Sequence, residues 1–95
     1  MRLVPLGYGN FVAAGRILVV VAPDSAPVRR SVSEARKQGQ VVDATAGHRT
    51  RSVVFMDTGQ LVLSALAPET VAARVHRLDH PAALAGPEPE EEAPS

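Results

Sequence analysis

The sequence predicts a small α+β domain with a mainly antiparallel sheet and two helices. Apolar runs of strand length are separated by turn residues, and two other stretches have apolar residues at helical spacing after proline-containing starts. The two apolar runs at 52–56 and 60–64 are joined only by Asp-Thr-Gly at 57–59. Such a short glycine-containing connection is typical of a β-hairpin, which favours antiparallel pairing.

The N-terminal residues predict two strands around a tight turn. Residues 2–6 are expected to form an edge strand, because Pro5 cannot donate a backbone hydrogen bond to a neighbour. Gly7-Tyr8-Gly9-Asn10 predicts a turn or bulge. A phosphate-binding glycine loop is the alternative, but the third glycine is missing and residues 11–14 lead into a strand instead of a helix.

Residues 16–22 are the strongest strand candidate. Their unbroken apolar run indicates that both faces are covered, either at the centre of the sheet or between the sheet and a partner subunit. Arg16 begins this strand. It is expected to be a solvated strand end, and a place at a subunit interface or beside DNA is the alternative.

The first helix is expected to begin at Asp24 or Ser25, to accept Pro27 in its first turn and to end at Gly39. Val28, Val32 and Ala35 form its apolar face. The opposite face is basic and contains Arg29, Arg30, Arg36 and Lys37. This face is either simply solvated or turned toward phosphates, and Glu34 is placed to pair with Arg30 one turn earlier.

The second helix is predicted to begin at Pro68-Glu69-Thr70, and Pro81 ends any continuation. Residues 1–78 are therefore expected to form one folded domain. Residues 79–95 are rich in Pro and Glu and hold few residues that could be buried, which predicts a disordered acidic tail.

Composition limits the kind of protein this can be. The chain has 95 residues, is 45% hydrophobic and only 3% aromatic, and has no cysteine. A small core of Val, Ala and Leu gains from burial against other subunits. No secretory signal pattern is visible and no apolar run approaches the ~20 residues of a membrane span. A soluble cytoplasmic protein without membrane contact is expected.

The formal net charge of zero conceals a division along the chain. All ten Arg and Lys residues lie in residues 1–78 with five acids, which leaves that part at +5. Residues 79–95 hold the other five acids and no Lys or Arg. A basic body with an acidic tail is typical of polyanion-binding proteins.

Enzymatic chemistry is not predicted. Ser25 or Ser64 could be combined on paper with His48 and Asp43 as a hydrolytic triad, but no local nucleophile motif supports this. His76 and His80 have helical spacing, yet Pro81 follows directly, which argues against a metal site. No cofactor and no small-molecule substrate are expected.

The segment DATAGHRTR, residues 43–51, predicts an exposed loop between two strands and carries His48, Arg49 and Arg51. Arginine offers a planar fork of donors that matches phosphate oxygens or a guanine edge, so this loop predicts a DNA-binding surface. Ordinary solvated loop charges are the alternative.

Four blocks of the chain carry a family resemblance. They are GYGN (7–10), RILVVVAPDSAPVRR (16–30), DATAGHRTRSVVFMD (43–57) and LVLSALAPETVAAR (61–74). In this order and spacing the chain resembles the bacterial RemA family, the extracellular matrix regulatory proteins. The resemblance covers about residues 3–74 and leaves only the acidic tail outside.

The resemblance implies an α+β subunit related to LytTR-type DNA-binding domains that assembles into a ring and contacts double-stranded DNA from outside. It implies transcriptional regulation, notably of biofilm-matrix genes. The adjacent arginine pair of the family falls on His48 and Arg49, with Arg51 kept, so His48 is a departure that makes weaker or pH-dependent DNA binding an expectation. Family positions are also matched at Arg16, Pro27, Arg29 and Arg30. A scaffold ring that binds no nucleic acid, with arginines paired to Asp43 or Glu69 of neighbours, is the alternative.

Overall fold

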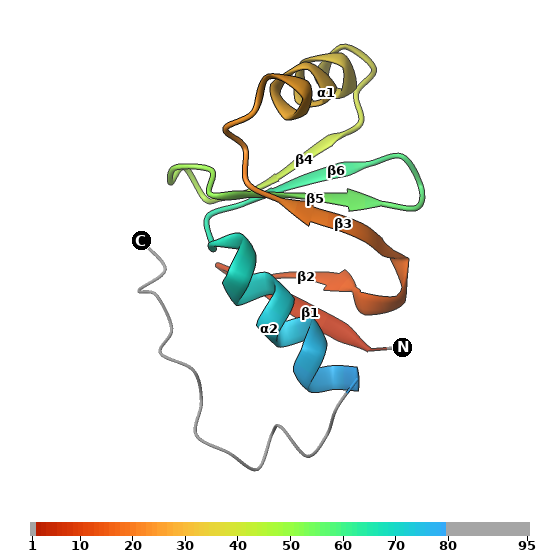
Figure 1. The fold of residues 1–95 in the computed structure, drawn as a ribbon, viewed down its shortest axis with the longest axis vertical. Coiled ribbons are helices and arrows are strands. Elements are labelled where there is room, and N and C mark those ends of the chain that lie inside the picture. The colour runs from red at the N-terminus through yellow and green to blue at the C-terminus, as the bar shows by residue number, and fades with distance from the viewer. Residues whose placement is uncertain (1, 80–95) are drawn as a thin grey trace.

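A computed structural model describes residues 2–79; residues 80–95, which contain most of the predicted acidic tail, lie outside the described residues. Figure 1 shows the order of the elements along the chain. They are β1 (Leu3–Gly7), β2 (Asn10–Ala13), the 3-10 turn η1 (Ala14–Arg16), β3 (Ile17–Val21), α1 (Ala26–Lys37), β4 (Val41–Ala44), β5 (Ser52–Met56), β6 (Leu61–Ser64) and α2 (Pro68–Asp79).

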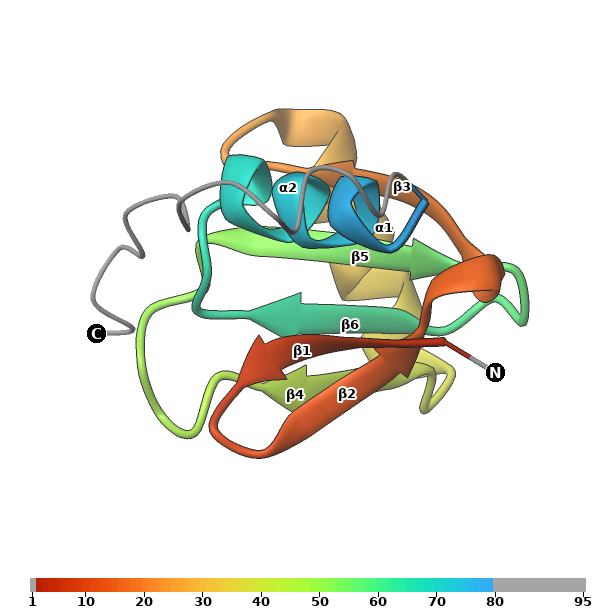
Figure 2. The same cartoon turned by 90° about the horizontal axis from the view of Figure 1, so that it is seen from below.

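The elements form three layers around a four-stranded sheet with the strand order β3-β5-β6-β4. Helix α1 covers one face of this sheet (Figure 1). The two-stranded hairpin β1-β2 and helix α2 lie side by side on the other face, with α2 toward β3 and the hairpin toward β4 (Figure 2). The α+β class and the two helices are confirmed.

The sheet is mixed, which refines the prediction of a mainly antiparallel sheet. Strands β3, β5 and β6 pair antiparallel, as does the separate hairpin, but β4 runs parallel to β6. The reason lies in the connection after β4, since residues 45–51 cross the end of β6 to reach β5. Strand β5, the next strand along the chain, therefore does not pair with β4.

Strand β3 lies at an edge of the sheet, so its predicted central position is wrong. The register shifts between Ile17 and Val19, and the residues Leu18 and Val19 are 67% and 46% exposed. An apolar run indicates what a strand could bury and does not distinguish a covered strand from an edge strand. The alternative, that a partner subunit covers β3, remains a prediction. Arg16 ends η1 and does not begin the strand.

The core has two parts because successive residues of a strand face opposite sides of the sheet. Val53, Leu61 and Leu63 pack with Ala35 under α1. The other face packs against β1 and α2, and its buried residues are Val4, Leu6, Ala44, Val54, Val62, Leu66 and Val71. The predicted core of Val, Ala and Leu is confirmed.

Short sequence motifs predicted the helix and turn boundaries correctly. The Ser25 hydroxyl accepts a hydrogen bond from the Val28 amide at 3.3 Å and caps α1, and Gly39 follows the helix with φ +70°. Tyr8 and Gly9, at φ +57° and +80°, make the predicted turn. The expected ion pair differs, since Glu34 lies 3.9 Å from Lys37 and no pairing with Arg30 is formed within residues 2–79.

Candidate nucleic-acid interface

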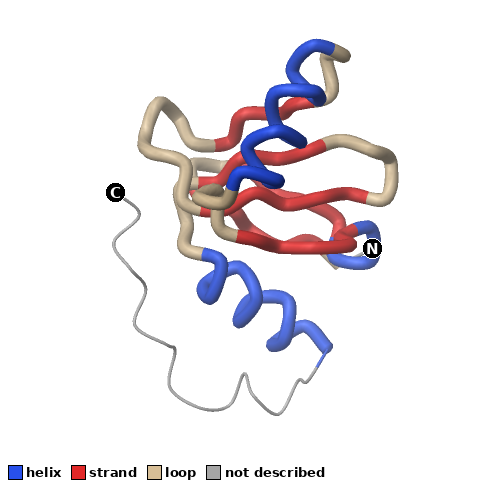
Figure 3. Tube along the Cα trace, turned by 45° about the horizontal axis from the view of Figure 1, so that its top comes forward, coloured by secondary structure: helices blue, strands red, loops and turns tan. Residues whose placement is uncertain are grey.

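Five chain segments meet at one end of the sheet, which we call the loop end. Strand β3 pairs antiparallel with β5, so residues 22–25 and the start of α1 come beside the start of β5. Strands β4 and β6 run parallel, so loop 45–51 comes beside the start of α2. These segments gather on the left of Figures 1 and 3. Both helices therefore begin at the loop end.

Loop 45–51 begins with a tight turn fixed by hydrogen bonds. The Asp43 carboxylate accepts from the amide and hydroxyl of Thr45 at 2.9 and 2.7 Å. The Thr45 carbonyl accepts from the His48 amide at 2.9 Å, across Ala46 and Gly47 in the left-handed region. These bonds from Thr45 favour the ionised form and lower the pKa of Asp43.

The His48 ring stacks on the ring of Tyr8, with centroids 4.7 Å apart and planes 13° from parallel. Its Nδ1 lies 3.2 Å from the Thr45 carbonyl oxygen. A carbonyl oxygen only accepts hydrogen bonds, so Nδ1 carries the proton in this contact. In a neutral ring, Nε2 is then the nitrogen that can accept a hydrogen bond. The Asn10 side chain also donates to the Ala44 carbonyl at 3.2 Å. The turn of the β1-β2 hairpin thus holds the loop in place.

Arg49 and Arg51 follow this anchored turn. The Arg51 amide donates to the Ser64 carbonyl at 2.8 Å, which ties the loop to the end of β6. Within residues 2–79 neither guanidinium forms an ion pair or a hydrogen bond. Both line a hollow of about 320 Å³ at the loop end. Its other lining residues are Ala22, Pro23, Asp24, Thr50, Ala67, Pro68 and Glu69.

A second hollow of about 420 Å³ lies between α1 and the sheet and shares Pro23 and Thr50 with the first. Arg29 and Arg36 line it, and the Arg29 guanidinium donates to the Asp24 carbonyl at 2.7 Å. Arg29 is therefore brought beside the loop arginines. The predicted site omitted Arg36, although its spacing of seven residues from Arg29 places both on one side of a helix.

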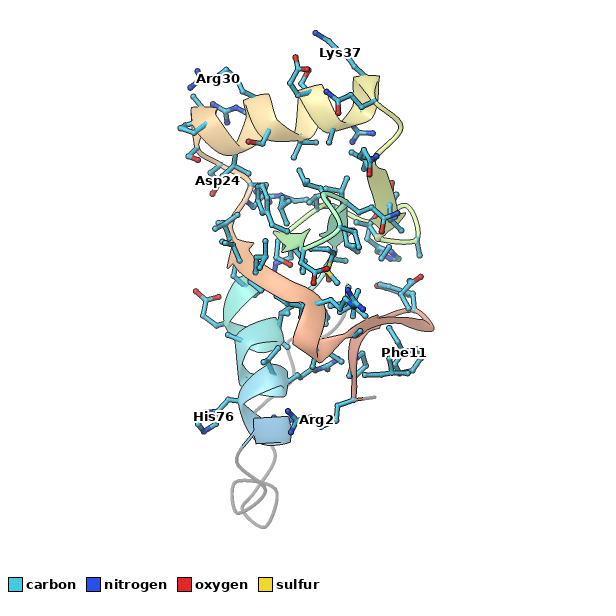
Figure 4. The ribbon with its side chains drawn as sticks, turned by 90° about the vertical axis from the view of Figure 1, so that its right-hand side faces the viewer. Arg2, Phe11, Asp24, Arg30, Lys37 and His76 are labelled. Carbon is cyan, nitrogen blue, oxygen red and sulfur yellow. The ribbon has the colours of Figure 1, made fainter. Side chains whose placement is uncertain are left out.

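The other predicted residues lie elsewhere. Arg30 and Pro27 line a different flank of α1, and Figure 4 shows the Arg30 side chain directed away from the sheet. Arg16 lies at the opposite end of the sheet, where its guanidinium is 3.4 Å from the Asp57 carboxylate. The structure thus brings Arg29 close to Arg49 and Arg51 and leaves His48 against Tyr8, just before the two loop arginines. The remaining three residues lie apart from this cluster.

The residues considered for hydrolysis have structural hydrogen bonds instead of a shared site. Ser25 caps α1, the buried Ser64 hydroxyl donates to the Leu6 carbonyl at 3.2 Å, and Asp43 holds Thr45. Residues 2–79 contain no group of three His, Cys, Asp or Glu side chains suited to a metal ion. Neither described helix is long and apolar enough to cross a membrane.

Comparison with known sequences places this chain. Residues 3–75 match the family described as RemA-like, extracellular matrix regulatory protein A-like. The chain belongs to the RemA-like family. A protein of Synechococcus elongatus that carries the name "Putative regulatory protein" is 58% identical over 73 residues, which cover 77% of this chain and 84% of that relative. A protein of Symbiobacterium thermophilum with the same kind of name is 53% identical over 91 residues, which cover 96% of this chain and 94% of that relative.

A third RemA-like relative, from Geobacillus kaustophilus, is 49% identical over 79 residues, covering 83% of this chain and 91% of the relative. It too is named as a regulatory protein. The family and these relatives are named for regulation and not for an enzymatic reaction. The RemA-like assignment therefore supports a regulatory role.

Proposed function

We propose that this chain is a DNA-binding transcriptional regulator of the extracellular-matrix type, which contacts DNA phosphates through arginines at the loop end. The observation that carries the proposal is the convergence of Arg29, Arg49 and Arg51 from two separate segments. Guanidinium groups bind phosphate oxygens through paired hydrogen bonds, and this geometry suits a polyanion.

The backbone supports the same assignment. Helices α1 and α2 both begin at the loop end, so their positive dipole ends add to the arginine charges. Asp24 and Glu69 reduce that field locally. Few side chains there offer a base-reading pattern, so recognition through DNA shape and phosphate spacing is expected in place of a short base code.

Assembly into a ring of identical subunits completes the proposal. Leu18 and Val19 are exposed on the β3 edge, and Phe11 and Val42 are exposed toward the opposite edge of the molecule, at 58% and 44%. Two different apolar patches on opposite edges favour head-to-tail contact, which closes into a ring when the rotation allows. A ring repeats the weak contacts of one subunit along the DNA.

Fluorescence anisotropy of the full chain with a duplex of several helical turns, over a salt series, tests this function. The logarithm of affinity is expected to fall steeply with the logarithm of salt concentration, by about 0.9 for each phosphate neutralised. Arg49→Gln and Arg51→Gln should each make that slope shallower, and Arg30→Gln should have a smaller effect. Lys37→Gln, an exposed charge on α1, is the matched control. Absence of binding at low salt would refute the proposal.

A scaffold ring without nucleic acid is the second candidate. It is favoured by one observation, that Glu69 and Asp24 line the same hollow as Arg49 and Arg51. If these arginines pair with acids of a neighbouring subunit, a variant that carries both Arg49→Gln and Arg51→Gln should lose its assembled mass in light scattering. Retention of the assembled mass together with loss of DNA binding would exclude the scaffold function.

A further inference from the structure

The hollow between α1 and the sheet has chemistry of its own. Val32, Val53 and Leu63 provide apolar walls, and Arg29 and Arg36 stand at its rim. Its lining includes Ser33 and Thr50 and no Asp or Glu. Asp43 lies outside this lining, although the hydrogen bonds from Thr45 and then the charge of Arg36 lower its pKa. An apolar hollow lined by two guanidinium groups and no carboxylate suits an anionic chain that also has apolar parts.

Helix α1 is buried against the sheet most deeply near its C-terminal end, which leaves this hollow open. Ala35, near the C-terminal end of α1, is the buried residue of this helix, whereas Val28 and Val32 are only partly buried. Arg29 and Arg36 are seven residues apart, which is about 10 Å along a helix. An occupant would therefore be elongated, with anionic groups spaced over several residues.

The chain itself contains a segment with these properties. Residues 80–95 hold Glu88, Glu90, Glu91 and Glu92 and have no Lys or Arg; Pro89 lies between the acids, and Pro and Ala residues flank them. Their charge is opposite to that of the rim. The neighbouring hollow is a poorer partner, because Asp24 and Glu69 line it.

The length of the segment is sufficient. Helix α2 starts at the loop end and runs 12 residues to Asp79, which is about 18 Å. Glu88 is nine residues beyond Asp79 and can lie up to about 30 Å away along an extended chain. The path to α1 must also pass the end of the sheet, because α1 and α2 lie on opposite faces. Glu92 is 13 residues beyond Asp79 and has up to about 45 Å of extended chain for this path.

We propose that residues 88–92 bind the hollow lined by Arg29 and Arg36 in their own chain and compete with DNA for Arg29. The inference rests on the proposed function for its effect on DNA, and the binding itself does not depend on DNA. Competition between the acidic segment and phosphates makes DNA affinity lower than the arginine loop alone would give.

The first experiment detects the contact without DNA. Methyl NMR spectra of the full chain and of the full-length E88Q/E90Q/E91Q/E92Q variant are compared at low salt. Methyl shifts of Val32, Val53 and Leu63 should differ between the two, and those of Val12 should not. Unchanged shifts at the hollow, or changes confined to other sites, would overturn the proposal. Changes that depend on protein concentration would assign the contact to a second copy and overturn binding within one chain.

The second experiment links the contact to DNA. The tail variant should bind a generic duplex about three- to tenfold more tightly than the natural chain at low salt, with the difference lost at high salt. Arg36→Gln should abolish the gain, since Arg36 belongs to the hollow and not to the proposed DNA contacts. An equal gain in both backgrounds would show general charge repulsion and overturn the proposal. If no variant binds DNA, the proposed function fails while the methyl shifts still decide this inference.

Discussion

The two ends of the sheet use the same residue type differently. At the end opposite the loop, the Arg16 guanidinium lies 3.4 Å from Asp57 and its charge is balanced by that carboxylate. At the loop end, Arg49 and Arg51 have no such partner within residues 2–79, and two helices begin beside them. Position in the fold thus distinguishes a paired arginine from an arginine that remains available to a polyanion.

The largest contrast is expected from removing charge at each end. The double variant Arg49→Gln, Arg51→Gln should weaken binding to a generic duplex about 100-fold at low salt, because each lost phosphate contact costs about 1–2 kcal/mol. Arg16→Gln should change affinity less than about threefold. Anisotropy titrations at matched salt measure both. Similar losses of DNA affinity in the double variant and in Arg16→Gln would show that position at the loop end does not determine DNA binding.

A substitution that adds a full positive charge at the loop end should strengthen DNA binding instead of weakening it. His48→Arg is expected to tighten DNA binding about three- to tenfold and to steepen the salt slope by about 0.9, as one further phosphate is neutralised. Arginine also stacks on aromatic rings, so the contact with Tyr8 can be kept. His48→Gln, which adds no charge, is the control. A slope that does not change in His48→Arg would place this side chain outside the DNA contact.

The anchoring of the loop predicts a smaller effect at a residue outside the arginine cluster. Tyr8→Asn retains a residue type that tolerates the left-handed backbone at this position and removes the ring that stacks on His48. DNA affinity should fall about two- to fivefold, since the loop loses part of its order before binding. Tyr8→Phe keeps the ring and should retain affinity. An equal loss in both variants would exclude stacking as the cause.

Sequence predicted the features that depend on neighbouring residues. The cap at Ser25, the stop at Gly39 and the hairpin at 57–59 each follow from a short local motif. The parallel pairing of β4 with β6 has no such motif, because it depends on a crossing between distant strands. The stack of His48 on Tyr8 was missed for the same reason.

The predicted site residues also divide into those that local sequence places correctly and those whose position depends on the fold. Arg49 and Arg51 were placed together correctly on one exposed loop, since loop neighbours stay close in space. Arg29 and Arg30 were both predicted to lie on one basic face, but adjacent residues of a helix point about 100° apart and these two line different flanks of α1. Arg36, two turns away from Arg29, shares its side.

The smallest effect concerns stability at the loop end. Bonds from Thr45 lower the pKa of Asp43, so the folded protein favours the ionised carboxylate. The resulting stability is present above the pKa of the unfolded chain and is lost as pH falls through the lower pKa of the folded state. Asp43→Asn should therefore reduce the free energy of unfolding at pH 7 by less than about 1 kcal/mol, given how exposed the side chain is.

Urea denaturation at neutral and acidic pH measures this difference. The deficit of Asp43→Asn should shrink as the natural chain loses its carboxylate charge, because both proteins then present a neutral side chain to Thr45. Asp57→Asn is the matched substitution at the opposite end, where the exposed ion pair with Arg16 contributes little. A deficit of Asp43→Asn that persists unchanged in acid would mean that shape, and not charge, holds the turn before the arginines.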